Sequence, residues 1–262
     1  MTATATTHVR AAFFVVEGLW AWYRRNWKAS AVSSVVQPML FLVAFGLGFG
    51  SQVTPGAATG GLPYLVYLTP ALLVATAVNI AALESTYPVL GGFKWQSGYV
   101  AMAATPMSPA QIACGQLTWI TIRLTSSGLA YLVVAAALGA LTGPAALLAL
   151  PVAVLTGVGF AALLVAYSAT LETDRSYAAI YRFVVLPMAL FAGTFFPVDA
   201  LPVVLRPVAW LTPLWHGTEL ARGVTFGGLG LLPALGHLAY LLAVLAAGAW
   251  LSARNFRARL GV

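Results

Sequence analysis

Residues 29 to 83 read ASAVSSVVQPMLFLVAFGLGFGSQVTPGAATGGLPYLVYLTPALLVATAVNIAAL, which is 55 consecutive positions without a charged residue. A helix that crosses the hydrocarbon core of a bilayer needs roughly 20 apolar residues, so this stretch is long enough for two crossings with a break between them. Glycine and proline in the segments 50–56 and 60–63 provide that break. The stretch therefore predicts two membrane-spanning helices, at about residues 31–50 and 64–84.

Further charge-free runs cover 48 positions from Leu124 to Leu171 and 31 positions from Gly223 to Ala253. A tight Leu-Thr-Gly-Pro break at 141–144 divides the first of these runs. These runs predict spans at about 111–141, 145–170 and 231–251, and the apolar stretch between the two runs predicts one more span at about 178–196. We therefore expect an all-α membrane protein whose six transmembrane helices form one domain over residues 31–262.

The composition agrees with a membrane location, because hydrophobic residues make up 61% of the chain and charged residues only 7%. Soluble globular domains have roughly 45–50% and 25%. This excludes an ordinary soluble enzyme, a disordered chain and a nucleic-acid-binding protein. The single cysteine and three scattered histidines give no motif for a disulfide framework or a metal, so we predict no metal site.

The net charge of +7 indicates how the chain is oriented in the membrane, because Lys and Arg are concentrated on the cytosolic side. If the N-terminus lies in the cytosol, ten Lys and Arg residues fall inside and two outside, as the positive-inside rule requires. We therefore predict that both termini are cytosolic. Arg123 is expected near the inner edge of its span, where it can snorkel towards the interface, and Glu84 at the inner end of the second span.

Residues 1–30 are expected to form a cytosolic tail and an amphipathic helix on the membrane surface, because aromatic residues are mixed there with cations. A simple anchor and a role in coupling motion are both compatible with this pattern. The cytosolic loop between spans 2 and 3 contains Gly91-Gly92, followed by a helix-compatible stretch from Phe93 to Ala104. This exposed aromatic stretch predicts either a partner surface or a helix in the headgroup layer. Ser108 before Pro109 is expected to start the third span.

The outer segment between spans 5 and 6 contains two apolar pieces of about ten residues, too short to cross, which predicts a re-entrant helical hairpin. Its candidate residues are Asp199, His216, Glu219 and Arg222. Glu219 and Arg222 are three positions apart and can pair on one helix face. Either the hairpin acts as a lid or exit funnel, or its polar groups only satisfy one another.

Catalytic motifs are absent from the sequence. The only lysines are Lys28 and Lys94, and neither belongs to a Gly-x-x-x-x-Gly-Lys-Ser/Thr phosphate loop, so the chain is not expected to hydrolyse ATP by itself. The span interiors contain weakly polar residues, among which Asn79 is the strongest candidate for ligand contact because an unpaired amide is costly to bury.

Three motifs carry a family resemblance: ATPMSP at 104–109 with Gly115, FAGTFFP at 191–197 with Leu-Pro at 201–202, and PVAWLTPLWH at 207–216 with ELARG at 219–223. In this order they resemble the membrane subunits of type-2 ABC exporters, a group that includes the nodulation lipo-oligosaccharide permease and the daunorubicin-resistance permease. The resemblance implies a multi-pass subunit of a bacterial cytoplasmic membrane that exports an amphipathic substrate: a drug, lipid, glycolipid or lipo-oligosaccharide.

The same resemblance implies partners. A second permease copy, most simply in a homodimer, and two copies of a separate ABC ATPase that bind ATP and Mg²⁺ would complete the transporter among the membrane lipids. The cytosolic stretch resembles the family's coupling helix, with Phe93, Lys94, Trp95 and Tyr99 as ATPase contacts. Spans 1, 2 and 5 would line the path; our candidates there are Phe41, Phe45, Asn79, Phe191 and Phe195. A stand-alone carrier or channel and a membrane-embedded enzyme are the alternatives.

Overall fold

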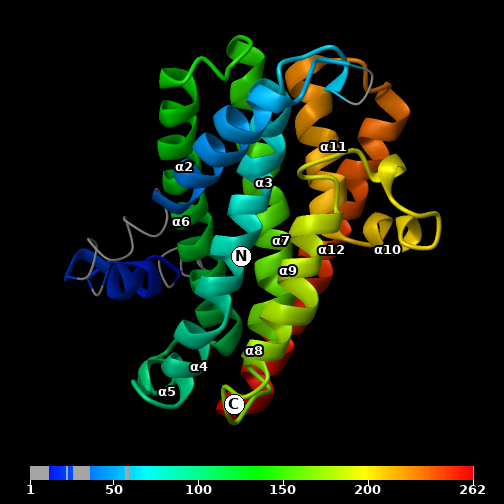
Figure 1. The fold of residues 1–262 in the computed structure, drawn as a ribbon. Coiled ribbons are helices and arrows are strands. Elements are labelled where there is room, and N and C mark those ends of the chain that lie inside the picture. The colour runs from blue at the N-terminus through cyan, green and yellow to red at the C-terminus, as the bar shows by residue number, and fades with distance from the viewer. Residues whose placement is uncertain (1–11, 22, 26–35, 57–58, 262) are drawn as a thin grey trace.

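The computed structural model describes residues 12–21, 23–25, 36–56 and 59–261, which Figure 1 shows as a bundle of helices. No strand occurs among these residues, which confirms the all-helical prediction. Residues 12–21 and 23–25 are helical and are called the N-terminal helix. In chain order the elements that follow are α2 (Gln37–Phe41), the π-helix η2 (Leu42–Gly48), η3 (Phe49–Gln52), α3 (Tyr64–Ser85), α4 (Tyr87–Phe93), α5 (Gly98–Ala103), α6 (Pro109–Ala137), η5 (Pro144–Leu148), α7 (Ala149–Ser168), α8 (Tyr177–Ile180), the π-helix η6 (Tyr181–Val185), α9 (Leu186–Phe191), η7 (Val198–Ala200), α10 (Arg206–Trp210), α11 (Pro213–Phe226) and α12 (Leu231–Leu260).

Four of the described helical stretches are long and apolar enough to cross a membrane. They are Tyr64–Phe93, Pro109–Ala137, Pro144–Ser168 and Leu231–Leu260. Two shorter apolar stretches, Met39–Gln52 and Tyr177–Phe191, lie where the first and fifth spans were predicted. Residues 31–35 of the predicted first span lie outside the described residues, so the count of six spans stays a prediction.

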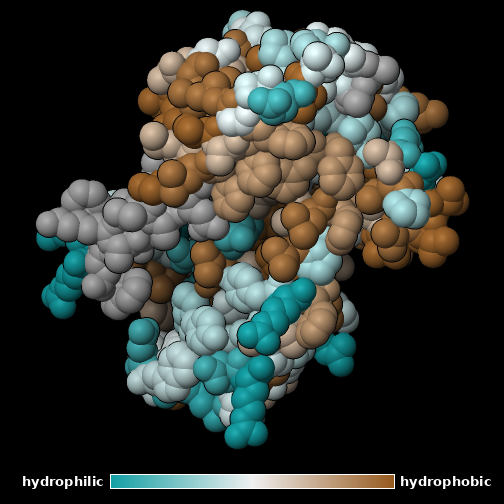
Figure 2. Space-filling model, viewed as in Figure 1, coloured by the Kyte–Doolittle hydropathy of each residue, from teal (hydrophilic) through white to brown (hydrophobic). Residues whose placement is uncertain are grey.

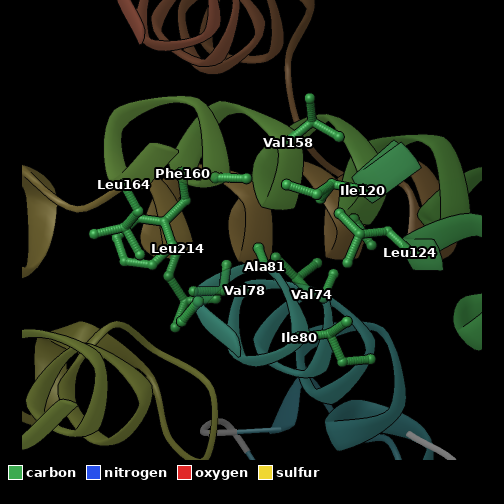
Figure 3. Close-up of a cluster of buried hydrophobic side chains, with 14 of the residues drawn as sticks. Val74, Val78, Ile80, Ala81, Ile120, Leu124, Val158, Phe160, Leu164 and Leu214 are labelled. Atoms are coloured by element: carbon green, nitrogen blue, oxygen red, sulfur yellow. The ribbon is translucent and has the colours of Figure 1, made fainter. Parts of the chain in front are cut away.

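The core of the bundle is centred on α7, with α3, α6, α11 and α12 packed around it. Figure 3 shows side chains of α3, α6, α7 and α11 that meet in this core. Close approach depends on glycine on α12, because a Cβ atom at Gly248 would lie only 2.7 Å from the Cβ atom of Ala162 on α7. Small residues at such contacts bring helix backbones together within the bilayer.

Two predicted helix starts are confirmed. Helix α3 begins at Tyr64, directly after Pro63. Ser108 caps α6 by accepting a hydrogen bond from the backbone N–H of Gln111, and the Gln111 side chain accepts one from the Ser108 backbone N–H. This reciprocal capping box satisfies two backbone donors that the first turn of a helix leaves free.

The expected helix from Phe93 to Ala104 is divided in the structure. Helix α4 ends at Phe93 and α5 begins at Gly98, and between them Ser97 adopts a left-handed conformation with φ of 51°. The Gly91-Gly92 pair does not precede a helix as we expected, because both glycines lie inside α4. They leave room for aromatic rings: a Cβ atom at Gly92 would meet the Tyr99 ring at 2.5 Å.

The N-terminal helix has one buried side, and its predicted place on the membrane surface stays a prediction. Val15 is fully buried, whereas Phe13, Phe14 and Trp20 are exposed. Its buried side packs on α6, where Gly115 provides space for Val15. On the face seen in Figure 2, hydrophobic residues gather over the upper and middle parts of the bundle and hydrophilic residues over the lower end, where Figure 1 places α5 and the C-terminus.

Candidate transport cavity

A cavity of about 690 Å³ lies between η2, α3, η6 and α9. Residues of the N-terminal helix and α6 complete its wall. This volume falls within the range of about 300–1,000 Å³ that small-molecule sites occupy. The π-helices η2 and η6 both contribute lining residues, and π-helical turns within helices are frequent at functional sites.

One face of α3 forms the back wall. Its lining residues recur every three or four positions: Leu72, Ala75, Thr76, Asn79, Ile80, Leu83 and Glu84. Residues at this spacing share one side of a helix. From Leu72 to Glu84 the stripe extends over about 18 Å at a rise of 1.5 Å per residue. Along it the side chains change from apolar to amide and then to carboxylate, so the cavity has two chemically different ends.

The first is the aromatic end, formed by Phe41, Phe45 and Phe195. The rings of Phe41 and Phe45 are stacked with centroids 5.8 Å apart, and the Phe45 and Phe195 centroids lie 4.9 Å apart. The Tyr64 hydroxyl donates a hydrogen bond of 2.9 Å to the Phe195 carbonyl. The backbone that carries one of the three rings is therefore fixed to α3.

The second is the charged end, formed by Glu84, Trp119 and Arg123. The Glu84 carboxylate accepts hydrogen bonds from Arg123 Nε at 3.0 Å and from Trp119 Nε1 at 3.3 Å. The Arg123 guanidinium also lies 4.3 Å from the ring centroid of Tyr23 in the N-terminal helix. Arg123 is buried, with 5% of its surface exposed, so it does not snorkel as we expected. A buried ion pair holds it within the protein.

Four of the five residues predicted to line the transport path are lining residues of the cavity. Phe41, Phe45, Asn79 and Phe195 all line the cavity. Asn79 lies midway along the α3 stripe, and its amide makes no hydrogen bond to another described residue. Phe191 is not part of the lining and is 43% exposed at the end of α9. The sequence analysis did not identify Glu84, Trp119 and Arg123 as cavity residues. An acid and a base near the inner ends of two neighbouring spans, Glu84 and Arg123, could have indicated an ion pair there.

Of the four predicted contact residues in the loop that contains α4 and α5, two are buried and two are at least partly exposed. Phe93 and Tyr99 are buried, and their rings form an aromatic cluster with Phe256 of α12. The Tyr99 hydroxyl donates a hydrogen bond of 2.8 Å to Gln116 Oε1 on α6. Trp95, by contrast, is 62% exposed.

Lys94 lies partly exposed at the edge of this loop and forms an ion pair with Glu172. Glu172 also pairs with Arg259 of α12, at 3.5 Å. The hydrogen bond and charge of Lys94 hold the pKa of Glu172 below its ordinary value. These contacts fasten the loop to the C-terminal end of α12.

The predicted hairpin residues occupy several positions at the other end of the bundle. Arg222 lies 3.8 Å from Glu219, which confirms the predicted pair. Arg222 also donates to the carbonyls of Gly193 and Thr194, at 2.8 and 3.1 Å. It therefore holds the turn that precedes Phe195 and the aromatic end. Asp199 is exposed, and its side chain makes no hydrogen bond or ion pair with a described residue.

His216 pairs with a residue that sequence reasoning had not connected to it. Its Nδ1 lies 2.9 Å from Nδ1 of His237, and its Nε2 lies 3.0 Å from the Trp210 carbonyl. Because a carbonyl only accepts, His216 Nε2 carries the proton and His216 Nδ1 accepts from His237. Burial, and secondarily the charge of His237, lower the pKa of His216 to about 4. Within the described residues, no group of three or more potential metal ligands comes together.

Apolar helices long enough to cross a membrane, with a cavity that has an aromatic end and a charged end, are features of a membrane transport subunit. The model of the ABC-2 type transporter family matches residues 12–226. The chain belongs to this family, which confirms the resemblance noted in its motifs.

Curated relatives agree with this assignment. Nodulation protein J of Rhizobium leguminosarum bv. trifolii is 34% identical over 213 residues, which cover 78% of this chain and 80% of that protein. Its counterpart in R. leguminosarum bv. viciae is 33% identical over 213 residues, covering 78% and 81%. Nodulation protein J of Sinorhizobium fredii is 32% identical over 214 residues, covering 78% and 80%.

Proposed function

We propose that this chain is the permease subunit of an ATP-driven exporter with six spans and with both termini in the cytosol of a bacterium. Its substrate is an amphipathic molecule, such as a drug, lipid, glycolipid or lipo-oligosaccharide, taken from the cytoplasm or the inner leaflet. The observation that carries this proposal is the cavity. An apolar chain fits its aromatic end, and a polar group fits its charged end.

Energy comes from a separate ABC ATPase in two copies, which bind ATP and Mg²⁺, and a second permease copy completes the assembly. Two observations support this. The sequence has no phosphate-binding loop, and members of this family are transporter membrane subunits. In the assembly, the hairpin of α10 and α11 lies in the outer leaflet and closes the exit.

The loop around α5 is the docking surface for the ATPase, and its residues have different roles. Trp95 and Lys94 are accessible and make the contact. Phe93 and Tyr99 position the loop from within, because both are packed against α12 and Tyr99 is hydrogen-bonded to α6. An exposed tryptophan is well suited to a protein interface, where buried tryptophans often dominate the binding energy.

Copurification tests the proposal. Tagged full-length chain, extracted in mild detergent from its own cells, is expected to retain an ATPase subunit with a phosphate-binding loop. Trp95→Ala should lower the amount retained by about tenfold, the loss expected for one interface hot spot. Trp250→Ala is the matched control, because Trp250 is also 62% exposed but lies on α12. If wild-type chain retains no ATPase, the exporter proposal is wrong; if Trp95→Ala behaves like the control, the docking surface is wrong.

A further inference from the structure

The charges that line the cavity do not cancel. They belong to Glu84, Arg123 and Arg182. The Glu84 carboxylate is satisfied by Arg123 at 3.0 Å and by Trp119 at 3.3 Å. Arg182 is exposed and forms no ion pair with another described residue. The excess charge of the cavity wall is therefore one positive charge, carried by Arg182.

Arg182 lies at the same end of the bundle as Glu84. It follows α8 in the chain, and Tyr177 of α8 packs against Tyr87 at the start of α4, with ring centroids 5.1 Å apart. The N-terminal helix also borders this end and adds two exposed arginines, Arg24 and Arg25, and one exposed acid, Glu17. The described part of the N-terminal helix is therefore positive by one charge.

From Arg182 a continuous apolar wall leads towards the aromatic end. The lining residues of η6 and α9 recur at Val185–Leu186 and Ala189–Leu190, on the same side as Arg182. Between Arg182 and Leu190 the wall is about 12 Å long at 1.5 Å per residue. A molecule with an acidic group at one end and an apolar chain at the other matches both features.

We infer that the cavity binds an anionic amphiphile. Its carboxylate, sulfate or phosphate group pairs with Arg182, and its apolar chain lies against Phe41, Phe45 and Phe195. The inference rests on the proposed exporter function and names the substrate class of the same site. Arginine suits this role because its planar guanidinium can donate two parallel hydrogen bonds to such an anion. A cationic amphiphile is disfavoured, since no lining carboxylate is left without a partner.

The experiment uses full-length chain in nanodiscs of phosphatidylcholine. Three probes share one undecyl chain with a dansyl group at its far end and differ only in the head: a carboxylate, its methyl ester, or a primary amine. Energy transfer from tryptophan to dansyl reports binding, because Trp119 lines the cavity. Transfer measured in empty nanodiscs gives the background from the scaffold protein and from probe that has partitioned into lipid, and this background is subtracted.

We expect the carboxylate to bind roughly five- to tenfold more tightly than the ester, as one partly solvated ion pair allows, and the amine to bind most weakly. Arg182→Gln should abolish this preference and leave ester binding unchanged, because Arg182 is exposed and the variant should fold. Arg257→Gln, which removes an exposed arginine of α12 outside the cavity, should keep the preference. Phe45→Ala should weaken all three probes.

Two results overturn the inference: equal binding of acid and ester by wild type, or a preference that survives Arg182→Gln. If either result occurs while Phe45→Ala still weakens the ester, the amphipathic cavity stands and only its charge preference is wrong. If Phe45→Ala leaves all probes unaffected, the cavity is not their site and the exporter proposal loses its main support. Nanodiscs that contain phosphatidylglycerol distinguish the sources of the anion. Competition with the acid indicates a lipid headgroup, and its absence indicates a single-chain substrate.

Discussion

Replacement of Arg123 by methionine removes one partner of the ion pair at the charged end of the cavity. The Arg123 and Glu84 side chains are only 6% and 19% exposed, so the remaining carboxylate is left largely desolvated. Breaking a buried pair in this way costs about 3–5 kcal/mol. Because Glu84 keeps some solvent contact, we expect the lower limit, about 3 kcal/mol, including the lost contact with the Tyr23 ring.

A double-mutant cycle isolates this effect. Glu84→Gln alone should also destabilise the protein, because it leaves a buried guanidinium without its counter-charge. The double variant should recover most of the loss, since replacing both members of a buried pair is often nearly neutral. The measurement is the melting temperature in mild detergent, followed by size-exclusion chromatography. A loss of about 3 kcal/mol corresponds to roughly 6–12 °C for a domain of comparable size.

Arg257→Met is the control for this cycle, and we expect it to change stability by less than about 0.5 kcal/mol because Arg257 is exposed. The reasoning is refuted if Arg123→Met melts within about 2 °C of wild type. It is also refuted if the shifts of the two single variants simply add in the double variant, since additivity means that the residues do not interact.

Three further changes test other contacts. Gly248→Leu should destabilise the protein by about 3 kcal/mol, because the side chain overpacks against α7, and this should lower the melting temperature. Gly236→Ala on the same helix is the control and should leave the melting temperature unchanged, because nothing lies within 4 Å of a Cβ atom there. Equal melting temperatures for the two variants would contradict the close packing of α12 on α7. Tyr64→Phe removes the hydrogen bond to the Phe195 carbonyl and should cost about 1 kcal/mol in the same melting assay; wild-type stability would argue against that bond. Because the folded pKa of Glu172 is lowered, its ion pair contributes above the ordinary value of 4.5 and is lost as pH falls through the folded value. The protection factor of amides in the α4–α5 turn, which is the intrinsic exchange rate divided by the measured rate at the same pH, should therefore fall in wild type as the pH is lowered below 4.5, and a Glu172→Gln variant that shows the same fall would exclude this cause.

Local features of the fold were predictable because they depend on neighbouring residues. Pro63 and Ser108 mark the starts of α3 and α6, since each provides the backbone geometry or the cap that a first turn requires. The same local reasoning failed at Gly91-Gly92. Whether a glycine pair breaks a helix or provides room for a ring depends on Tyr99, whose position is set by packing against α12.

The cavity could be predicted only in part, because some of its residues are brought together by helix packing rather than by neighbours in the sequence. Its aromatic residues lie on spans that the family resemblance singled out, so Phe41, Phe45 and Phe195 could be named in advance. The pair of Glu84 and Arg123 joins residues 39 positions apart, and snorkelling was the simpler expectation for a lone arginine near a span end. Only the side-by-side packing of α3 and α6 brings the two charges together.

The same packing determines which walls of the cavity can move at low cost. Helices α3 and α7 are held on several sides, with 78% and 67% of their spanning windows buried. The opposite walls are held less firmly: η2 buries only Leu42 and Gly46, and η6 buries only Val185. Local opening costs least where few apolar contacts are lost. Displacement of η2 and η6 against α3 is therefore the change in cavity shape that loses the fewest apolar contacts.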